Sequence, residues 1–240
     1  MKKIIFGLVF LAVTACRTDY YWPSVQNVPL FDEKQELQLL VGAGKENTFF
    51  QSAYSLTNHI GFQFTYKTTM ENYGISYDDK ISSNYLVEGG IGYYFKYQYL
   101  AFETFAGYGY SYIQRDDYFR KSIVDFNRKY LQPSIGFSSD YIDVAFTPRF
   151  SKVNYSIIEN TIYHSSVYDN ILQNIDKNSF YFFEPGITMR FGFKNIKIQF
   201  QHVEVKKLNS DQLDYVSAGN TVSILFTIPL KKKQLMGRRN

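Results

Sequence analysis

The chain has three histidines, which are the first residues to consider for catalysis because histidine is the side chain best suited to acid–base chemistry near neutral pH. His202 is followed two residues later by Glu204, His164 is followed by two serines, and His59 lies in a predicted turn. A hydrolase of lipid or peptide with its site around His202 or His164 is therefore one alternative function. Neither histidine has a second catalytic residue at a constrained spacing, and His59 is typical of a turn position. We expect no catalytic residues, no cofactor and, without a His or Cys cluster at ligand spacing, no metal.

The second chemically distinctive residue is Cys16, which is the only cysteine and so excludes an intrachain disulfide. It follows a cationic start, an apolar run over 4–13 and small residues before the cysteine, a pattern typical of a signal peptide over residues 1–15. The apolar run is too short to span a bilayer as a helix. This region resembles the lipobox of bacterial lipoproteins, which implies removal of residues 1–15 and attachment of acyl chains such as palmitate to Cys16. An ordinary signal peptide with an incidental cysteine is the alternative.

The segment 180–193 indicates what kind of element must position the remaining polar residues. Its alternate residues form one polar and glycine-rich set and one largely apolar set, which a strand would place on opposite faces: Phe180, Phe182, Glu184, Gly186, Thr188, Arg190 and Gly192 against Tyr181, Phe183, Pro185, Ile187, Met189, Phe191 and Phe193. A face that mixes glycine with full charges is a poor lining for a dry core. The pattern therefore predicts a barrel with an apolar outside that faces lipid and a polar inside.

Similar alternation recurs along the chain and predicts an all-β fold, in agreement with 22 Phe and 22 Tyr residues. Tight turns and long polar loops alternate between the predicted strands, which is typical of a ten-stranded antiparallel up-and-down transmembrane β-barrel with long external loops and short periplasmic turns. The domains are then a signal peptide (1–15), a periplasmic linker (16–34), the barrel (35–230) and a basic periplasmic tail (231–240). Both termini would be periplasmic. The ten predicted strands are 35–43, 48–56, 60–68, 84–95, 98–112, 128–138, 141–153, 179–193, 196–206 and 218–230.

The predicted inward faces carry full charges, which cannot face hydrocarbon and need partners when buried. We expect the acidic residues to be matched across the lumen by the basic ones, in a network of Glu88, Glu103, Asp143, Arg149, Glu184, Arg190 and Lys197. The predicted tight turns at 96–97, 139–140 and 194–195 also set long side chains against glycines: Glu103 opposite Gly90, Asp143 opposite Gly136, and Lys197 opposite Gly192. Since about eight strands leave room only for side chains, such pairing in ten strands predicts a filled or narrow lumen.

Charge and loop composition exclude other functions. Without Lys2, Lys3 and the five basic residues of the tail, 19 basic remain against 22 acidic residues, a net charge of −3 that gives no support to nucleic acid as a partner. Glycine clusters without a following helix do not form a phosphate loop.

The predicted external loop 154–178 contains a candidate helix that begins at Ser165 or Ser166. Its apolar residues form one stripe: Val167, Ile171, Leu172 and Ile175. The helix would be either a lid or a partner-binding surface.

Three stretches carry a resemblance over most of the mature chain: 27–31 (NVPLF), 51–61 (QSAYSLTNHIG) and 184–192 (EPGITMRFG). They are similar to a family of outer-membrane lipoproteins of Bacteroidota-type bacteria that has no assigned activity. The resemblance implies lipidation and a barrel, and it implies no chemistry. We therefore expect a non-enzymatic outer-membrane lipoprotein with a structural or ligand-binding role, whose partners are membrane lipids and an external ligand or protein bound through the loops. A soluble, lipid-anchored barrel of lipocalin type, with its apolar face inward, is the third alternative.

Overall fold

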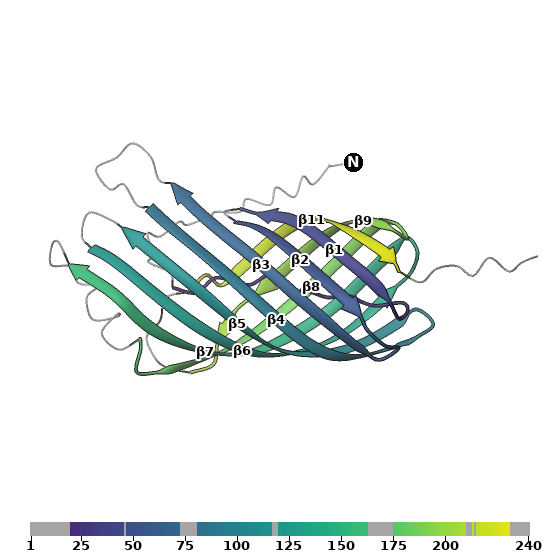
Figure 1. Ribbon diagram of the computed structural model, residues 1–240, viewed down its shortest axis with the longest axis horizontal. Helices are drawn as coiled ribbons and strands as arrows, with labels where there is room; N and C mark the ends of the chain where they lie inside the picture. The colour runs from purple at the N-terminus through teal and green to yellow at the C-terminus, as the bar shows by residue number, and fades with distance from the viewer. Residues whose placement is uncertain are drawn as a thin grey trace, which may run out of the picture.

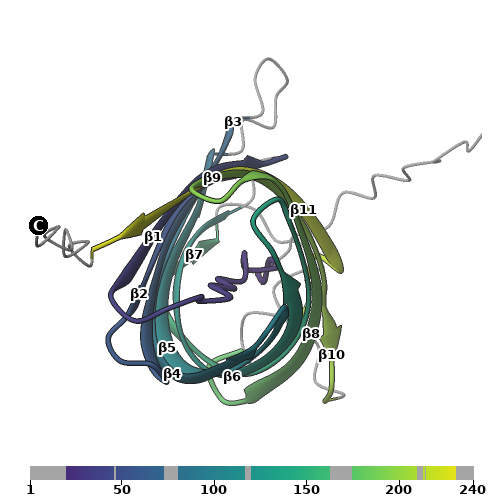
Figure 2. The same ribbon diagram turned by 90° about the vertical axis from the view of Figure 1, so that its right-hand side faces the viewer.

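The computed structural model describes residues 20–45, 47–72, 81–116, 120–162, 175–209, 213 and 215–230. These residues form eleven antiparallel strands in one sheet, with hydrogen bonds from β1 to β11 and from β8 to β9 that close it into a barrel (Figures 1 and 2). The two-residue β10 directly follows β9 and pairs with β8, so the wall is a ten-stranded barrel. The strands are β1 Glu36–Gly44, β2 Asn47–Ser55, β3 Ile60–Asn72, β4 Ile81–Tyr97, β5 Leu100–Asp116, β6 Arg120–Ser138, β7 Ile142–Ile162, β8 Ser179–Phe193, β9 Ile196–Glu204, β10 Lys206–Lys207 and β11 Ala218–Pro229.

The predicted ten-stranded up-and-down barrel is confirmed. All ten predicted segments are strands, and β8 has the predicted bounds. The main difference concerns length, because β6 begins at Arg120 and β7 runs to Ile162. Residues 120–127 and 154–162 are therefore wall rather than loop. Among the described residues no helix is long and apolar enough to cross a membrane.

The barrel has two different ends. At one, which we call the turn end, short connections such as 98–99 and 194–195 join the strands. At the other, which we call the loop end, lie the longer connections, and there β3 to β7 extend furthest (Figure 1, left).

The turn that joins β4 to β5 is at 98–99 rather than the predicted 96–97, so Glu103 pairs with Tyr94 and not with Gly90. Asp143 pairs with Ser138 rather than Gly136, whereas Lys197 does pair with Gly192, as predicted. Gln98 has a φ of 54°, which the tight turn requires.

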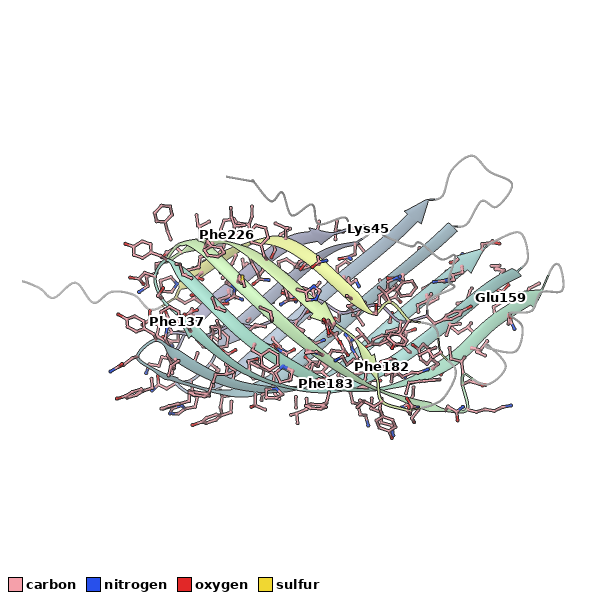
Figure 3. All side chains as sticks on the ribbon, turned by 180° about the vertical axis from the view of Figure 1, so that it is seen from behind. Lys45, Phe137, Glu159, Phe182, Phe183 and Phe226 are labelled. Carbon is pink, nitrogen blue, oxygen red and sulfur yellow. The ribbon has the colours of Figure 1, made fainter. Side chains whose placement is uncertain are left out.

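The outer wall is apolar and the inner wall polar. Ile187 on β8 and Phe200 on β9 are 44% and 48% exposed, whereas Arg190, three residues after Ile187 on β8, is 2% exposed. Phe137 and Phe226 project from the outside of the wall (Figure 3). Outward tyrosines gather in two belts, Tyr97, Tyr99 and Tyr141 toward the turn end and Tyr66, Tyr85, Tyr108 and Tyr181 toward the loop end. Two aromatic belts around an apolar band are typical of a barrel that spans an outer membrane, and the lipocalin-type alternative is wrong.

The N-terminal part of the described chain lies inside the barrel (Figure 2, purple). Every residue from Pro23 to Phe31 is buried. Tyr20 and Tyr21 lie toward the loop end, where Tyr21 bridges to Tyr215, and Phe31 lies toward the turn end, where β1 starts at Glu36. We call residues 20–31 the luminal segment. The sequence analysis expected a periplasmic linker here; the structure instead places this part of it within the lumen, because ten strands leave space that wall side chains do not fill.

Candidate functional site: the occupied lumen

The centre of the lumen holds a buried ion cluster contributed by four strands. Arg128 on β6 lies against Glu88 on β4, with its Nε donating to Glu88 Oε1 at 2.7 Å. Its Nη1 lies 3.7 Å from Glu184 Oε2 on β8, and Arg149 Nη1 on β7 lies 3.5 Å from Glu88 Oε2. These side chains are almost fully excluded from solvent. Because each carboxylate faces at least one guanidinium, the cluster meets the requirement that buried charges be paired.

The luminal segment completes this cluster with two hydroxyl groups. Tyr21 OH accepts a hydrogen bond from Arg128 Nη1 at 2.9 Å and donates one to Glu184 Oε1 at 2.6 Å. Ser24 Oγ donates to Glu88 Oε2 at 2.9 Å. Both hydroxyls therefore satisfy polar atoms of the wall that water would otherwise have to solvate.

A second cluster lies nearer the turn end. Lys197 Nζ donates to Asp143 Oδ1 at 2.7 Å, and Arg190 Nη1 lies 3.7 Å from Asp143 Oδ2. Arg190 also donates to the backbone oxygen of Val28 in the luminal segment. The structure thus brings together six of the seven residues expected in the lumen network, in two groups. The seventh, Glu103, is buried but faces no cation at ion-pair distance within the described chain; it accepts the Phe31 N–H at 3.1 Å.

Polar side chains of the wall pair with the backbone of the luminal segment, which has no regular structure of its own. Gln201 makes two bonds of 2.8 Å to Gln26, one to its N–H and one to its C=O, in the manner of a neighbouring strand. Four further wall donors reach the carbonyl groups of alternate residues along the segment: Lys67 to Pro23 (3.0 Å), Gln51 to Val25 (3.1 Å), Gln132 to Asn27 (2.6 Å) and Gln38 to Pro29 (2.8 Å). Backbone groups buried without strand partners are thereby satisfied.

Glycines on the inner wall provide the space for this segment. A Cβ atom on Gly61 would lie 2.6 Å from Phe31 Cε2, and one on Gly136 would lie 2.9 Å from Leu30 Cδ2. A Cβ on Gly186 would overlap the Gln26 amide. Of the three predicted pairs of glycine with a long side chain only Lys197 and Gly192 form, and at Gly61, Gly136 and Gly186 the large partner is the luminal segment rather than the facing strand.

Aromatic and aliphatic side chains close the lumen at the loop end. Tyr21 stacks on Phe182 with ring centroids 3.9 Å apart, and Tyr155 OH donates to the Tyr20 carbonyl at 3.0 Å. The surrounding apolar cluster includes Phe126, Val153, Phe180, Ile175 and Leu213. The other predicted members of the 165–175 helix stripe lie outside the described residues.

None of the described histidines lies in the lumen. His202 is on the outer face of β9, with Nδ1 2.8 Å from Asn220 Oδ1 and Nε2 3.8 Å from Glu204 Oε1. His59 stacks on Tyr93 at the turn end. His164 and Cys16 lie outside the described residues, within which no group of three His, Cys, Asp or Glu side chains could hold a metal.

Two important residues of the lumen were missed by the sequence analysis. Arg128 has a detectable signal, because Leu131 and Phe137 were assigned outward and parity then places residue 128 inward. Tyr21 has no such signal, since it belongs to no strand.

A closed ten-stranded barrel with an apolar band, two aromatic belts and a charged interior defines an outer-membrane β-barrel protein. No family model matches the chain, and no curated protein matches it. Among solved structures, the chain is similar to the outer membrane protease OmpT from Escherichia coli, with 11% identity and a TM-score of 0.45, over 80% of this chain and 92% of that chain. It is also similar to a loop L8 deletion mutant of OmpT, an outer membrane protein of Vibrio cholerae, with 6% identity and a TM-score of 0.27, over 80% and 97% of the two chains.

Proposed function

We propose that this protein is an acylated outer-membrane barrel with a structural or ligand-binding envelope role and no catalytic activity, and that it does not conduct because its own luminal segment occupies its interior. The observation that carries the proposal is the burial of residues 23–31 together with the hydrogen bonds that hold them. A substrate or solute would have to displace Tyr21 and Ser24 from buried carboxylates to pass. Binding of an external ligand or protein would then use the loops rather than the lumen.

The first test is electrical. The full-length protein reconstituted in a planar bilayer should show no steady conductance steps, while a general porin reconstituted in the same way conducts. Stable open steps from the unmodified barrel would contradict an occupied lumen. Heat-modifiable gel migration should show in parallel that the reconstituted barrel is folded.

Acylation of Cys16 is tested separately, by mass spectrometry of the mature protein and of Cys16→Ser. The protein with its native sequence should carry acyl chains at its N-terminus. The variant should lack them yet stay in the membrane fraction, because the apolar wall alone holds it there. Release of Cys16→Ser into the soluble fraction would contradict a membrane-spanning barrel.

The luminal segment also bears on where the anchor lies. Tyr20 is at the loop end, and Cys16 precedes it by four residues, which span at most about 14 Å. We therefore place the acyl chains in the leaflet at the loop end, and not in the periplasmic leaflet expected from strand counting. In intact cells, a membrane-impermeant maleimide should label Asp19→Cys as well as Lys177→Cys at the loop end, and should not label Lys194→Cys at the turn end. Labelling of Lys194→Cys without Asp19→Cys would reverse the assignment.

The alternative function, a lipid or peptide hydrolase, depends on His202 or His164. Within the described chain the contacts of His202 are the Asn220 amide and the Glu204 carboxylate, and neither is the hydroxyl or thiol nucleophile that a histidine base activates in Ser–His and Cys–His sites. His202→Ala and His164→Ala should leave any lipid or peptide hydrolysis by the purified protein at the level of the unmodified protein. A loss of hydrolysis in either variant with the barrel still folded would favour the enzyme.

A further inference from the structure

Two lysines face each other on the outer wall, where the barrel meets membrane. Lys129 on β6 is directly opposite Lys152 on β7, Tyr108 on β5 is opposite Lys129, and Tyr181 on β8 is opposite Lys152. All four side chains point outward and are exposed. We call these four residues the Tyr–Lys–Lys–Tyr row.

The row lies at the edge of the apolar band that is nearer the loop end. Lys152 is ten residues beyond the start of β7 at the turn end, which at about 3.4 Å per residue and a tilt of about 40° is about 26 Å along the barrel axis, close to the ~25 Å height of such a band. On the turn-end side the next outward pair is Leu131 and Phe150, and on the loop-end side it is Asn127 and Asn154. The lysines therefore mark the boundary between hydrocarbon and headgroups.

Two like charges directly opposite each other on a sheet repel, so the pair costs stability unless an anion lies between them. Among the described residues, neither lysine makes an ion pair with a carboxylate. Lys152 Nζ instead lies 5.5 Å from the centre of the Tyr181 ring. Both lysines, with Leu131, Phe150 and Tyr181, line a shallow depression on the outer wall.

We propose that the Tyr–Lys–Lys–Tyr row binds the phosphomonoester headgroup of a membrane lipid in the leaflet at the loop end. A phosphomonoester carries a charge of about −1.5 to −2 near neutral pH, which two ammonium groups neutralise, and its oxygens can also accept a hydrogen bond from the Tyr181 hydroxyl. The Tyr108 hydroxyl donates to Asn127 Oδ1 at 2.5 Å. The acyl chains extend along Leu131 and Phe150, which lie on the hydrocarbon side of the lysines. The proposal depends on the barrel in a membrane, and it holds whether or not Cys16 is acylated.

The test is binding of short-chain phosphatidic acid to the full-length protein in neutral-detergent micelles, measured by calorimetry or native mass spectrometry. K129Q/K152Q should bind it about 30-fold more weakly than the unmodified protein, since each lysine near an anionic headgroup contributes a factor of about five. K129R/K152R, which keeps both charges, should retain binding. The matched control is K34Q/K194Q, which removes two exposed lysines at the turn end and should also retain binding.

Two further probes identify the ligand class. Phosphatidylglycerol, whose phosphodiester carries a single charge, should bind more weakly than phosphatidic acid, and inorganic phosphate should bind more weakly still because it lacks acyl chains. Equal affinity of the unmodified protein, K129Q/K152Q and K34Q/K194Q for phosphatidic acid would overturn the site. Inorganic phosphate that binds as tightly as phosphatidic acid would overturn its assignment to a lipid. Heat-modifiable migration of each variant verifies folding, so that loss of binding is not loss of the barrel.

Discussion

Arg128→Met is the most informative single change, because it removes the cation that joins the two carboxylates of the central cluster. Arg128 is completely buried, donates to Glu88 at 2.7 Å and to the Tyr21 hydroxyl at 2.9 Å, and lies 3.7 Å from Glu184. Methionine fills a similar volume, so the main effect is electrostatic. Loss of one partner from a buried pair costs about 3–5 kcal/mol.

The geometry sets the expected value toward the lower part of that range. Glu88 would keep Arg149 at 3.5 Å and the Ser24 hydroxyl at 2.9 Å, so its charge would still be partly compensated. The Tyr21 hydroxyl would lose one bond, worth about 1 kcal/mol, but would keep its donation to Glu184. We therefore expect Arg128→Met to lower the free energy of unfolding by about 3–4 kcal/mol.

The assay is reversible denaturant unfolding of the barrel in lipid vesicles, followed by Trp22 fluorescence and by heat-modifiable gel migration. The double variant R128M/E184Q should be less destabilised than R128M, because Arg128 is the one cation at ion-pair distance from Glu184 among the described residues, whereas Glu88 keeps Arg149. The matched control is Lys121→Met, which breaks the half-exposed pair with Glu159 and should cost less than about 1 kcal/mol. A cost for Arg128→Met no larger than that of Lys121→Met, or a double variant less stable than R128M, would refute the reasoning.

Two further substitutions test the inner and outer surfaces of the wall. Gly61→Leu should destabilise the protein by about 1–3 kcal/mol and loosen the luminal segment, because any Cβ there meets Phe31, whereas Gly89→Leu should not, since a Cβ there meets nothing within 4 Å; equal effects in denaturant unfolding would contradict the packing. Ile91→Lys, about 15 Å from the turn end of β4, should cost about 2–4 kcal/mol in the same assay, and Tyr97→Lys at the end of that strand about 0–1. A larger cost at Tyr97 would place the membrane elsewhere.

The wall was predictable from the sequence because its signal is local. Alternation from Phe180 to Phe193 fixes both the faces and the bounds of β8 and places Arg190 inside, and the alternation of β9 places Gln199 inside. The turn between β4 and β5 was misplaced by two residues, because Lys96 and Tyr97 are as polar or aromatic as the actual turn residues and the alternation continues through them. A register error of this kind changes each cross-strand pair without changing any face.

The contents of the lumen were not predictable in the same way. Residues 20–31 have no period of two or 3.6 and contain Pro23 and Pro29, so a local reading gives only a linker. Their burial depends on the space that ten closed strands leave, which is a property of the whole wall. The inward glycines were recognised as making room, but sequence alone could not identify Phe31, Leu30 and Gln26 as the groups that use it.

The charge pairs of the lumen join wall to wall, which separates the stability of the barrel from the presence of the luminal segment. Glu88 and Arg128 belong to β4 and β6, and Asp143 and Lys197 to β7 and β9, so both pairs persist without residues 20–31. The segment adds hydroxyl groups and backbone carbonyls, which water can replace at a polar surface. A variant that lacks residues 20–31 should therefore still show heat-modifiable migration, and in a planar bilayer it should conduct where the full-length protein does not. A folded variant that remains closed would mean that the wall and the aromatic cluster at the loop end block the lumen by themselves.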